Sequence, residues 1–501
     1  MKEKKGEILV VLGCLLLITL TISVAYFMAR IEGEGKNIVL KSKDLKITFT
    51  ESNLLSGTNI EPGWSKTSTF TVKNESKDTY KYNIGIKDLV NTFVTTGYLQ
   101  YKITSADGGY NMNDFADVPK SSQAKDKILA YSVEIAKGAT QTYTVEFRYQ
   151  NTTEDQSEDM GKTLSGTLYI EKGTVDHGDY EEGTLGWQIL DDNTAREVRT
   201  DFSDVFTITN TETLYKATES IAGSAAKDVY YFAGDVKNNW VKFGGFYWRI
   251  IRTNADGSIR LLYSGTSPDT EEGYIATSAF NSSWKDPMHV GYMYGTSGTL
   301  ASNRTNENNS TIKGVIDSWY SNNLNSYTKY ISTEAVYCND RSLEDETNYP
   351  YSTSSTFFYA GRARINTKYK PTYDCINSKD AFSGSNTEAK LIYPISLMPA
   401  DEMSYAGGTY GRNLTSPYAW YYLNSAGGSI TGNKVWWSLS PVLWSNYSDV
   451  WFVAGSSSPG LINRERVYNS YGVRPVISIK SDALWSSGNG SSSSPYEIVY
   501  N

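Results

Sequence analysis

The chain has 501 residues, of which 47 are basic and 55 acidic, giving a net charge of −8, and it contains only two histidines. This length predicts two or three domains. Phosphate binding needs a surplus of positive charge, so the composition argues against a broad nucleic-acid-binding surface. The two histidines, His177 and His289, are far apart in sequence, which argues against a histidine-rich zinc site. We therefore expect no metal, no other cofactor and no nucleic-acid partner.

Residues 8–29 contain no charged side chain. As a helix they would be about 33 Å long, enough to cross the hydrocarbon core of a membrane. Three lysines lie within residues 1–7, so the positive-inside rule predicts a short cytoplasmic tail and places all later residues outside the cell. A cleaved signal peptide ending at Ser23-Val24-Ala25 is the alternative. Both interpretations predict extracellular domains, either on a single-pass membrane protein or on a secreted one.

Residues 37–172 alternate repeatedly between apolar and polar positions. Alternation of period two indicates strands with one buried and one solvated face. About seven such strands, separated by turns such as Glu61-Pro62-Gly63, predict an antiparallel β-sandwich. The polar stretch 114–127 is either a loop or a short helix. The alternating apolar positions are Leu45, Ile47, Phe49, Tyr80, Tyr82, Ile84, Ile86, Leu99, Tyr101, Ile103, Tyr131, Val133, Ile135, Tyr143, Val145, Phe147, Tyr149, Leu168 and Ile170.

Residues 59–86, NIEPGWSKTSTFTVKNESKDTYKYNIGI, are specific enough to compare with a known family. Together with Ala25-Tyr26-Phe27 they resemble the camelysin and biofilm-fibre family of bacterial surface proteins. This resemblance implies a jelly-roll-like sandwich. The family was once described as metalloprotease, but this region has no His-Glu-x-x-His motif and no histidine before His177. We expect the sandwich to be a spacer without catalytic activity.

Residues 173–227 are predicted to be a linker followed by a segment of uncertain fold. Glycine and acidic residues without periodicity dominate residues 173–186, as is typical of an exposed linker. Within the rest, Phe206 to Thr209 could form a short strand. Residues 211–228 could form either a helix or a loop.

Residues 228–501 have a different composition, since ten of the twelve tryptophans lie beyond position 230. They predict a separate α+β domain that begins with strands, joined in one place by the hairpin turn Asn254-Ala255-Asp256-Gly257. A helix is expected at residues 310–327, capped by Ser310. In a short helix at residues 400–406, Asp401 and Glu402 occupy the first turn. There their negative charges would interact favourably with the positive end of the helix dipole. The alternative is that the two residues act as a general acid/base pair.

Two of the three cysteines, Cys338 and Cys375, lie in this region, whereas Cys14 lies in the apolar N-terminal run. In an exported protein Cys338 and Cys375 are candidates for a disulfide, with two free buried thiols as the alternative. By loop closure, such a disulfide would contribute roughly 3–4 kcal/mol.

Several phrases of this domain are similar to a recurrent family of surface-protein domains of unassigned function, common in gut Gram-positive bacteria and their wall-less relatives. They are YYFAGDVKNNWVKFGGFYWRIIRTNADGSIRLLYSG, STIKGVIDSWYSNNL, VYCNDRS, LMPADEMSYAGG, WWSLSP and NSYGVRPVISIKSDALWSSGNGSSSSPYEI. Residues 436–476 also resemble the C-type-lectin-like fold, which occurs in formylglycine-generating-type domains and in variable receptor-binding proteins. The resemblance implies a C-type-lectin-like α+β domain.

In those lectin-like receptors the ligand contacts lie between the two motifs that here read WWSLSP and YGVRPV. Tryptophan and tyrosine offer large rigid contact areas, and arginine and asparagine offer directed hydrogen bonds. The alternative is that the tryptophans are core residues and the rest an ordinary polar loop between two strands, residues 450–454 and 473–479. The candidates that the resemblance implies are Trp444, Asn446, Tyr447, Asp449, Trp451, Asn463, Arg464, Glu465, Arg466 and Tyr468.

Two departures from these families limit the chemistry that we expect. The chain lacks the Glu-Pro-Asn and Gln-Pro-Asp triplets of calcium-dependent lectins. Formylglycine-generating enzymes need a close pair of active-site cysteines, whereas Cys338 and Cys375 precede the terminal motifs and are expected to pair only structurally. We expect a membrane-anchored surface protein that presents an adhesin-like module for an unknown glycan or protein, without catalysis. The alternatives are a structural component of a surface or biofilm fibre, and an enzyme acting on surface polymers.

Overall fold

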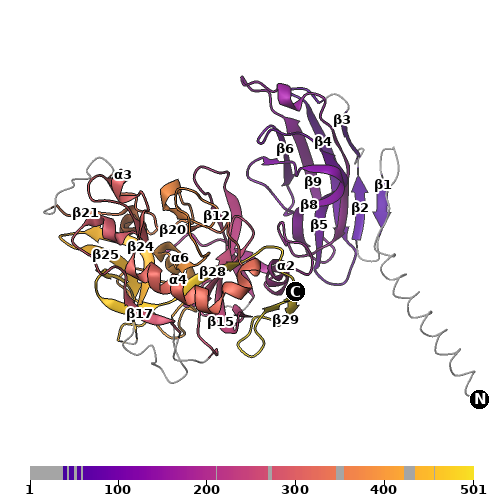
Figure 1. Cartoon of the computed structure of the whole chain (residues 1–501). Coiled ribbons are helices and arrows are strands. Elements are labelled where there is room, and N and C mark those ends of the chain that lie inside the picture. Colours follow the sequence, from indigo (N-terminus) through magenta and orange to yellow (C-terminus); the bar gives the residue numbers. More distant parts are fainter. Residues whose placement is uncertain are drawn as a thin grey trace, which may run out of the picture. The chain divides into compact units, whose positions relative to one another are not determined.

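The computed structural model is predominantly β and forms two compact units, residues 1–176 and 177–501 (Figure 1). Within the residues that it describes, no helix is long and apolar enough to cross a membrane. The predicted tail and anchor, residues 1–7 and 8–29, lie outside those residues. The structure describes residues 38–41, 45–49, 54–57, 60–209, 212–268, 273–345, 355–422, 435–455 and 457–500.

The first unit consists of two antiparallel sheets that share one apolar core. Tyr82 and Tyr143, one from each sheet, meet in this core with their hydroxyl oxygens 2.6 Å apart, and Gln141 accepts a hydrogen bond from Tyr82. One sheet has the order β1 (Ile38–Lys41), β2 (Leu45–Phe49), β4 (Ser65–Asn74), β9 (Thr140–Tyr149), β6 (Leu99–Ser105) and β7 (Ala116–Asp117). The other has the order β3 (Leu54–Gly57), β10 (Leu164–Lys172), β5 (Tyr80–Asn91) and β8 (Ser121–Ile135), and a short 3-10 turn, η1 (Ser157–Asp159), precedes β10.

The period-two segments of the sequence are strands, which confirms the coarse prediction of a sandwich. The interpretation of residues 114–127 as a loop or short helix is corrected, because β8 begins at Ser121. Residues 122–126 are all exposed on this strand, so no buried apolar side chain marks the alternation there. The strand is instead defined by its hydrogen-bonded neighbour β5.

In its described residues, the second unit contains two larger sheets and three two-stranded ones. The larger sheet has the order β11 (Ala195–Glu197), β12 (Thr213–Glu219), β13 (Lys227–Tyr231), β15 (Phe246–Thr253), β16 (Ile259–Tyr263), β28 (Pro475–Ile479) and β23 (Ser396–Leu397), with β14 (Trp240–Phe243) paired to β15. The next has the order β17 (Ala276–Ala279), β27 (Ser470–Val473), β24 (Trp436–Trp444), β25 (Ser448–Val453) and β26 (Ile462–Arg466), with β21 (Phe357–Phe358) paired to β24. The small sheets are β18 (Met293–Tyr294) with β19 (Asn308–Asn309), β20 (Tyr337–Cys338) with β22 (Ala381–Phe382), and β29 (Trp485–Ser487) with β30 (Glu497–Ile498).

Short helices connect these strands, and α4 is the longest of those that the structure describes. Ser310 caps α4 by accepting a hydrogen bond from the Lys313 amide at 3.3 Å, and Ile312 and Ile316 are buried on one face, as the sequence predicts. The helices are α2 (Leu185–Asp192), α3 (Leu300–Asn303), α4 (Thr311–Asn323), α5 (Ala360–Arg362) and α6 (Ala400–Ala406), with the 3-10 turns η2 (Pro287–Val290), η3 (Asn325–Tyr330) and η5 (Ser378–Asp380) and the π-helical turn η4 (Ala363–Thr367).

The interpretation of residues 173–227 as a linker and uncertain segment is corrected from residue 177 onward, because α2, β11 and β12 belong to the second unit. The predicted strand at Phe206 to Thr209 is reduced to an isolated bridge between Thr209 and Asp235. The stretch predicted as helix or loop contains β12, which pairs with β13. A strand acquires its hydrogen bonds from a neighbour, and local sequence does not show that neighbour.

A disulfide joins Cys338 of β20 to Cys375, whose Cα atoms are 5.7 Å apart. Cys375 is fully buried, and its backbone bonds to the segment after β12: its amide donates to Ser220 at 2.9 Å, and its carbonyl accepts from Ala222 at 2.8 Å. The disulfide thereby connects β20 to the end of β12 through the Cys375 segment.

Replacing both cysteines by serine should lower the free energy of unfolding of the second unit by about 4 kcal/mol, because the disulfide closes a loop between residues separated by 37 positions. Urea denaturation followed by tryptophan fluorescence would measure this difference, and the reduced wild type should behave like the double variant. An unchanged unfolding midpoint would contradict a stabilising disulfide between Cys338 and Cys375.

Candidate functional site

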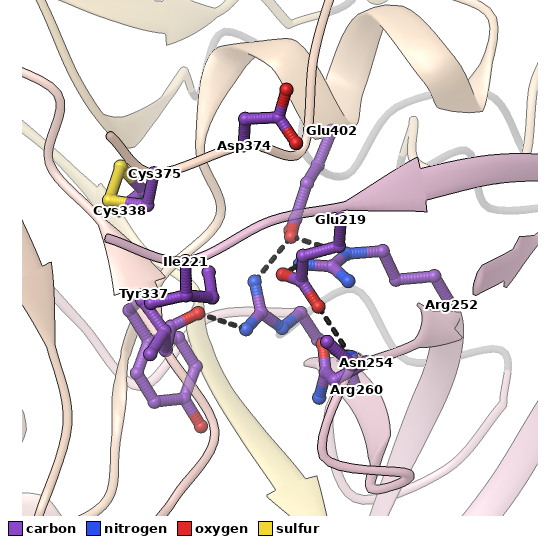
Figure 2. A network of polar contacts seen from close by, with 12 residues as sticks. Glu219, Ile221, Arg252, Asn254, Arg260, Tyr337, Cys338, Asp374, Cys375 and Glu402 are labelled. Carbon is purple, nitrogen blue, oxygen red and sulfur yellow. Dashed lines mark hydrogen bonds and ion pairs between the residues drawn. A yellow bond between two sulfur atoms is a disulfide. The ribbon is translucent and has the colours of Figure 1, made fainter. Parts of the chain in front are cut away.

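A buried network of charges lies within the second unit (Figure 2). Arg252 donates to Glu219 at 2.7 Å and to Glu402 at 2.9 Å. The same Glu402 oxygen, Oε1, also accepts a hydrogen bond from Arg260. These four side chains are at most 3% exposed, and the adjoining cavity is about 20 Å³. Such a cavity holds about one water molecule, so it does not admit an organic ligand.

Asp401 and Glu402 are held by different arginines. Asp401 accepts two hydrogen bonds from Arg364, at 2.8 and 2.9 Å, whereas Glu402 belongs to the buried network. Both carboxylates are buried. Their placement in the first turn of α6 is as predicted, but arginine pairing accounts for them more directly than the dipole of a seven-residue helix. The geometry gives no support to a general acid/base pair.

An open polar depression lies on β25 and β26, with a volume of about 440 Å³. β26 is the last strand of its sheet, so this edge is not covered by a further strand of that sheet among the described residues. Six of the ten predicted ligand contacts line the depression, and Tyr410 and Asn469 complete it. These six are Asp449, Asn463, Arg464, Glu465, Arg466 and Tyr468.

Part of the segment predicted as a loop is β26 itself. Along this strand Ile462 is buried and Arg464 and Arg466 are exposed. The hairpin with β25 pairs Asp449 with Arg466 and Trp451 with Arg464. Polar side chains are thereby fixed on a hydrogen-bonded backbone and not on a free loop.

The charges of the depression are partly paired with one another. Asp449, which is 5% exposed, accepts a hydrogen bond from Arg464 at 2.5 Å. Burial raises the pKa of the Asp449 carboxyl above its usual value, although the hydrogen bond from Arg464 acts in the opposite direction. Glu465 accepts hydrogen bonds from the Tyr471 hydroxyl at 3.2 Å and from the Arg466 amide at 2.8 Å.

An aromatic stack, which we define as Trp284, Tyr447 and Tyr468, lies beside the depression. The Trp284 and Tyr447 rings are stacked, with centroids 5.0 Å apart and an angle of 19° between the ring planes. The Tyr468 ring is 5.3 Å from Trp284. All three side chains are half-buried, so each retains exposed area for a ligand. Tyr468 also contributes to the depression, which makes the stack and the depression one site.

Sequence reasoning missed Trp284, because this residue precedes the candidate segment by a long stretch of chain. The link between them is a hydrogen bond from the Ser448 hydroxyl to the carbonyl of Asp286 at 2.7 Å, across 162 positions. A second bond runs from the Ser448 amide to the Trp284 carbonyl at 3.2 Å. The only sequence feature that could have pointed to this residue is the pair Trp284-Lys285 within a polar segment. Such a pair alone does not distinguish a ligand-binding site from an ordinary surface loop.

Two predicted contacts are corrected. Trp444 and Trp451 are 1% and 0% exposed, so they are core residues and cannot contact a ligand. The reason is that β24 is buried along its whole length and β25 lies between β24 and β26. Asn446 is exposed in the turn between β24 and β25, with a φ of 62°, but it does not line the depression.

A comparison with protein-family models found no match, and a comparison with curated proteins found none either. The chemistry of the site is therefore inferred from its own side chains. Within the described residues, no group of three or more His, Cys, Asp or Glu side chains is arranged to hold a metal ion. The depression offers aromatic rings, amides, two carboxylates and two guanidinium groups, which suit reversible binding.

Replacing Asp449 by Asn should increase the free energy of unfolding at pH 7. The folded pKa of Asp449 is raised, so its contribution to stability is full below the unfolded pKa of about 3.8 and is lost as the pH rises through the folded pKa. Arg464 is 46% exposed and stays solvated without its partner. Urea denaturation at several pH values would measure the gain, which should vanish below about pH 3.8.

Replacing Asp228, an exposed carboxylate of the same unit, by Asn is the matched control and should show no comparable gain at pH 7. An Asp449→Asn protein less stable than the wild type at pH 7 would contradict a raised pKa of Asp449 in the folded protein.

Proposed function

We propose that this chain is an extracellular surface protein that presents a ligand-binding, adhesin-like module on a β-sandwich. Residues 177–501 supply the module and the first unit serves as the stalk. Residues 8–29 anchor the protein in the cell membrane, or are removed on secretion. The observation that carries the proposal is the polar depression on β25 and β26, where six sequence-predicted contacts line one open surface beside the aromatic stack.

The composition of the site supports binding over catalysis. Aromatic rings and arginines dominate the residues that contribute most to recognition at protein surfaces. The network of charged side chains around Arg252 and Glu402 is enclosed and paired, with space for about one water molecule. A reaction on a surface polymer would require a nucleophile or an acid/base pair next to an open cleft.

The resemblance of residues 436–476 to the C-type-lectin-like fold supports the same proposal. In the lectin-like receptors that residues 436–476 resemble, the ligand surface lies on the strands and loops between the two motifs. Most residues of the depression lie in the corresponding stretch of this chain. The resemblance of residues 59–86 to biofilm-fibre proteins supports an extracellular location. It also keeps a structural role in a fibre as the second candidate, since β1 and β7 are the terminal strands of their sheet and such edges can pair with another chain.

The binding function is tested on an array of glycans and host proteins, using the protein without residues 1–36. Among the residues that the structure describes, the clusters of buried side chains lie beyond Lys41, so this protein retains them. A variant carrying Tyr447→Ala, Arg466→Ala and Tyr468→Ala should lose at least about tenfold in affinity, because it removes two half-buried tyrosines and an exposed arginine of the site. Its melting temperature should stay close to that of the wild type.

Tyr110→Ala is the matched control, since Tyr110 is an exposed tyrosine of the first unit. If binding survives the triple change, the ligand does not bind at β25 and β26. A wild type that binds no glycan, mucin or protein would contradict the binding function. Growth of the wild type into polymers, measured by sedimentation, would then favour the fibre.

A further inference from the structure

Two cations cover the rings of the aromatic stack. The Arg466 guanidinium carbon lies 4.1 Å from the centre of the Tyr447 ring, and the Lys285 ammonium lies 4.8 Å from the centre of the Trp284 ring. Tyr447 and Trp284 are stacked on each other, so the four side chains form a continuous cation–aromatic cluster. Cation–π contacts at exposed sites hold a positive charge in place without neutralising it.

Most other charges at this site have partners of their own. Arg464 is paired with Asp449 at 2.5 Å, and Glu465 accepts hydrogen bonds from Tyr471 and from the Arg466 backbone. Within the part of the chain that the structure describes, no carboxylate lies within 4.0 Å of the Arg466 or Lys285 side-chain nitrogens. The guanidinium of Arg466 donates instead to the uncharged Tyr468 hydroxyl at 2.9 Å. Neither cation is therefore in a close ion pair, although the Asp449 carboxylate, across the hairpin from Arg466, still attracts the Arg466 charge.

The edge of β26 is unsuited to an extended peptide, which would bind by adding a strand. The Arg464 amide donates to the Asn463 side chain, and the Arg466 amide donates to the Glu465 side chain, each at 2.8 Å. These local hydrogen bonds occupy donors that an added strand would need. Occupied edges of this kind protect sheets against pairing with other chains.

The remaining chemistry of the depression suits a hydroxylated ligand. Asn463, Asn469 and Tyr410 each offer donors and acceptors, and Asp449 offers a carboxylate that accepts from hydroxyl groups. The aromatic stack adds apolar area for the carbon face of a sugar ring. Polar groups that both donate and accept, next to aromatic rings and to cations outside any close ion pair, match a glycan that carries negative charge.

We infer that this depression binds a carboxylate-bearing glycan, whose carboxylate pairs with Arg466 and whose hydroxyls bond to Asn463 and Asn469, while Lys285 at the far ring of the stack adds a longer-range attraction. This inference rests on the proposed binding function and names its ligand class. Uronic acids and sialic acids share the required chemistry, a carboxylate on a pyranose ring. Because the cations are exposed, the affinity should fall as the sodium chloride concentration rises.

The experiment compares acidic and neutral forms of the same sugars, again with the protein lacking residues 1–36. One pair is polygalacturonate and its fully methyl-esterified form; the other is sialyllactose and lactose. Titration calorimetry should show binding of at least one acidic form that is at least about tenfold tighter than that of its neutral counterpart. The pair that shows the difference identifies the source of the carboxylate as a uronate or a sialate.

Substitutions then assign the charge. Arg466→Gln should weaken binding of the acidic form about tenfold, Lys285→Gln should weaken it by a smaller factor, and Arg466→Lys should retain more affinity than Arg466→Gln. Lys242→Gln is the matched control, because Lys242 is an exposed lysine of the same unit outside the site. Melting temperatures should be unchanged in all four variants.

The outcomes separate the ligand class from the site. If acidic and neutral forms bind with equal affinity, and this binding is lost in the Tyr447→Ala protein, the ligand is bound at this site but its carboxylate is not recognised. That result would overturn the acidic-glycan inference and leave the binding site in place. Preference for the acidic forms that persists in both glutamine variants would overturn the role of Arg466 and Lys285. Failure to bind any of the four sugars would overturn the acidic-glycan inference, while the array decides separately whether the protein binds another ligand.

Discussion

The buried charge network of Glu219, Arg252, Arg260 and Glu402 is the constraint on which the second unit depends. Removing four charges from water is costly, and the cost is offset only while each charge keeps its partner. The four residues come from β12, β15, β16 and α6, so the network fixes this helix against the larger sheet (Figure 2). Loss of one partner would leave an uncompensated buried charge, which is far more destabilising than loss of an exposed ion pair.

The network also positions the proposed site, through α6 and β24. The Ala400 amide at the start of α6 donates to the Ser440 hydroxyl at 3.0 Å, and Met398 accepts from the Leu439 amide at 3.0 Å. β24 pairs with β25, and β25 pairs with β26, which presents the polar side chains. The depression therefore rests on a chain of hydrogen-bonded elements that ends in a closed core. A site held in this way loses little conformational freedom when a ligand binds, which favours affinity.

Sequence reasoning succeeded where a local pattern has one structural solution. Period-two alternation predicted the strands of the sandwich, and a capping serine with an apolar stripe predicted α4. It failed where contacts with residues distant in sequence determine whether a side chain is buried or a segment forms a strand. Trp444 and Trp451 could not be separated from Tyr447, because aromatic side chains serve cores and binding surfaces alike, and only the burial of β24 and β25 distinguishes them. Trp284 joins the site through contacts with a distant segment, and β12 is a strand only because β13 lies beside it.

The central claim is that a single surface, the depression with its cation–aromatic cluster, recognises an acidic glycan. A crystal structure of the protein soaked with trigalacturonate or sialyllactose would test it most directly. The claim predicts a sugar ring in the depression with a carboxylate oxygen within hydrogen-bond distance of Arg466, and with Tyr447 or Trp284 in contact with its carbon face. Sugar density at another place, such as the 240 Å³ pocket formed by Lys329, Lys480 and neighbouring residues, would contradict it.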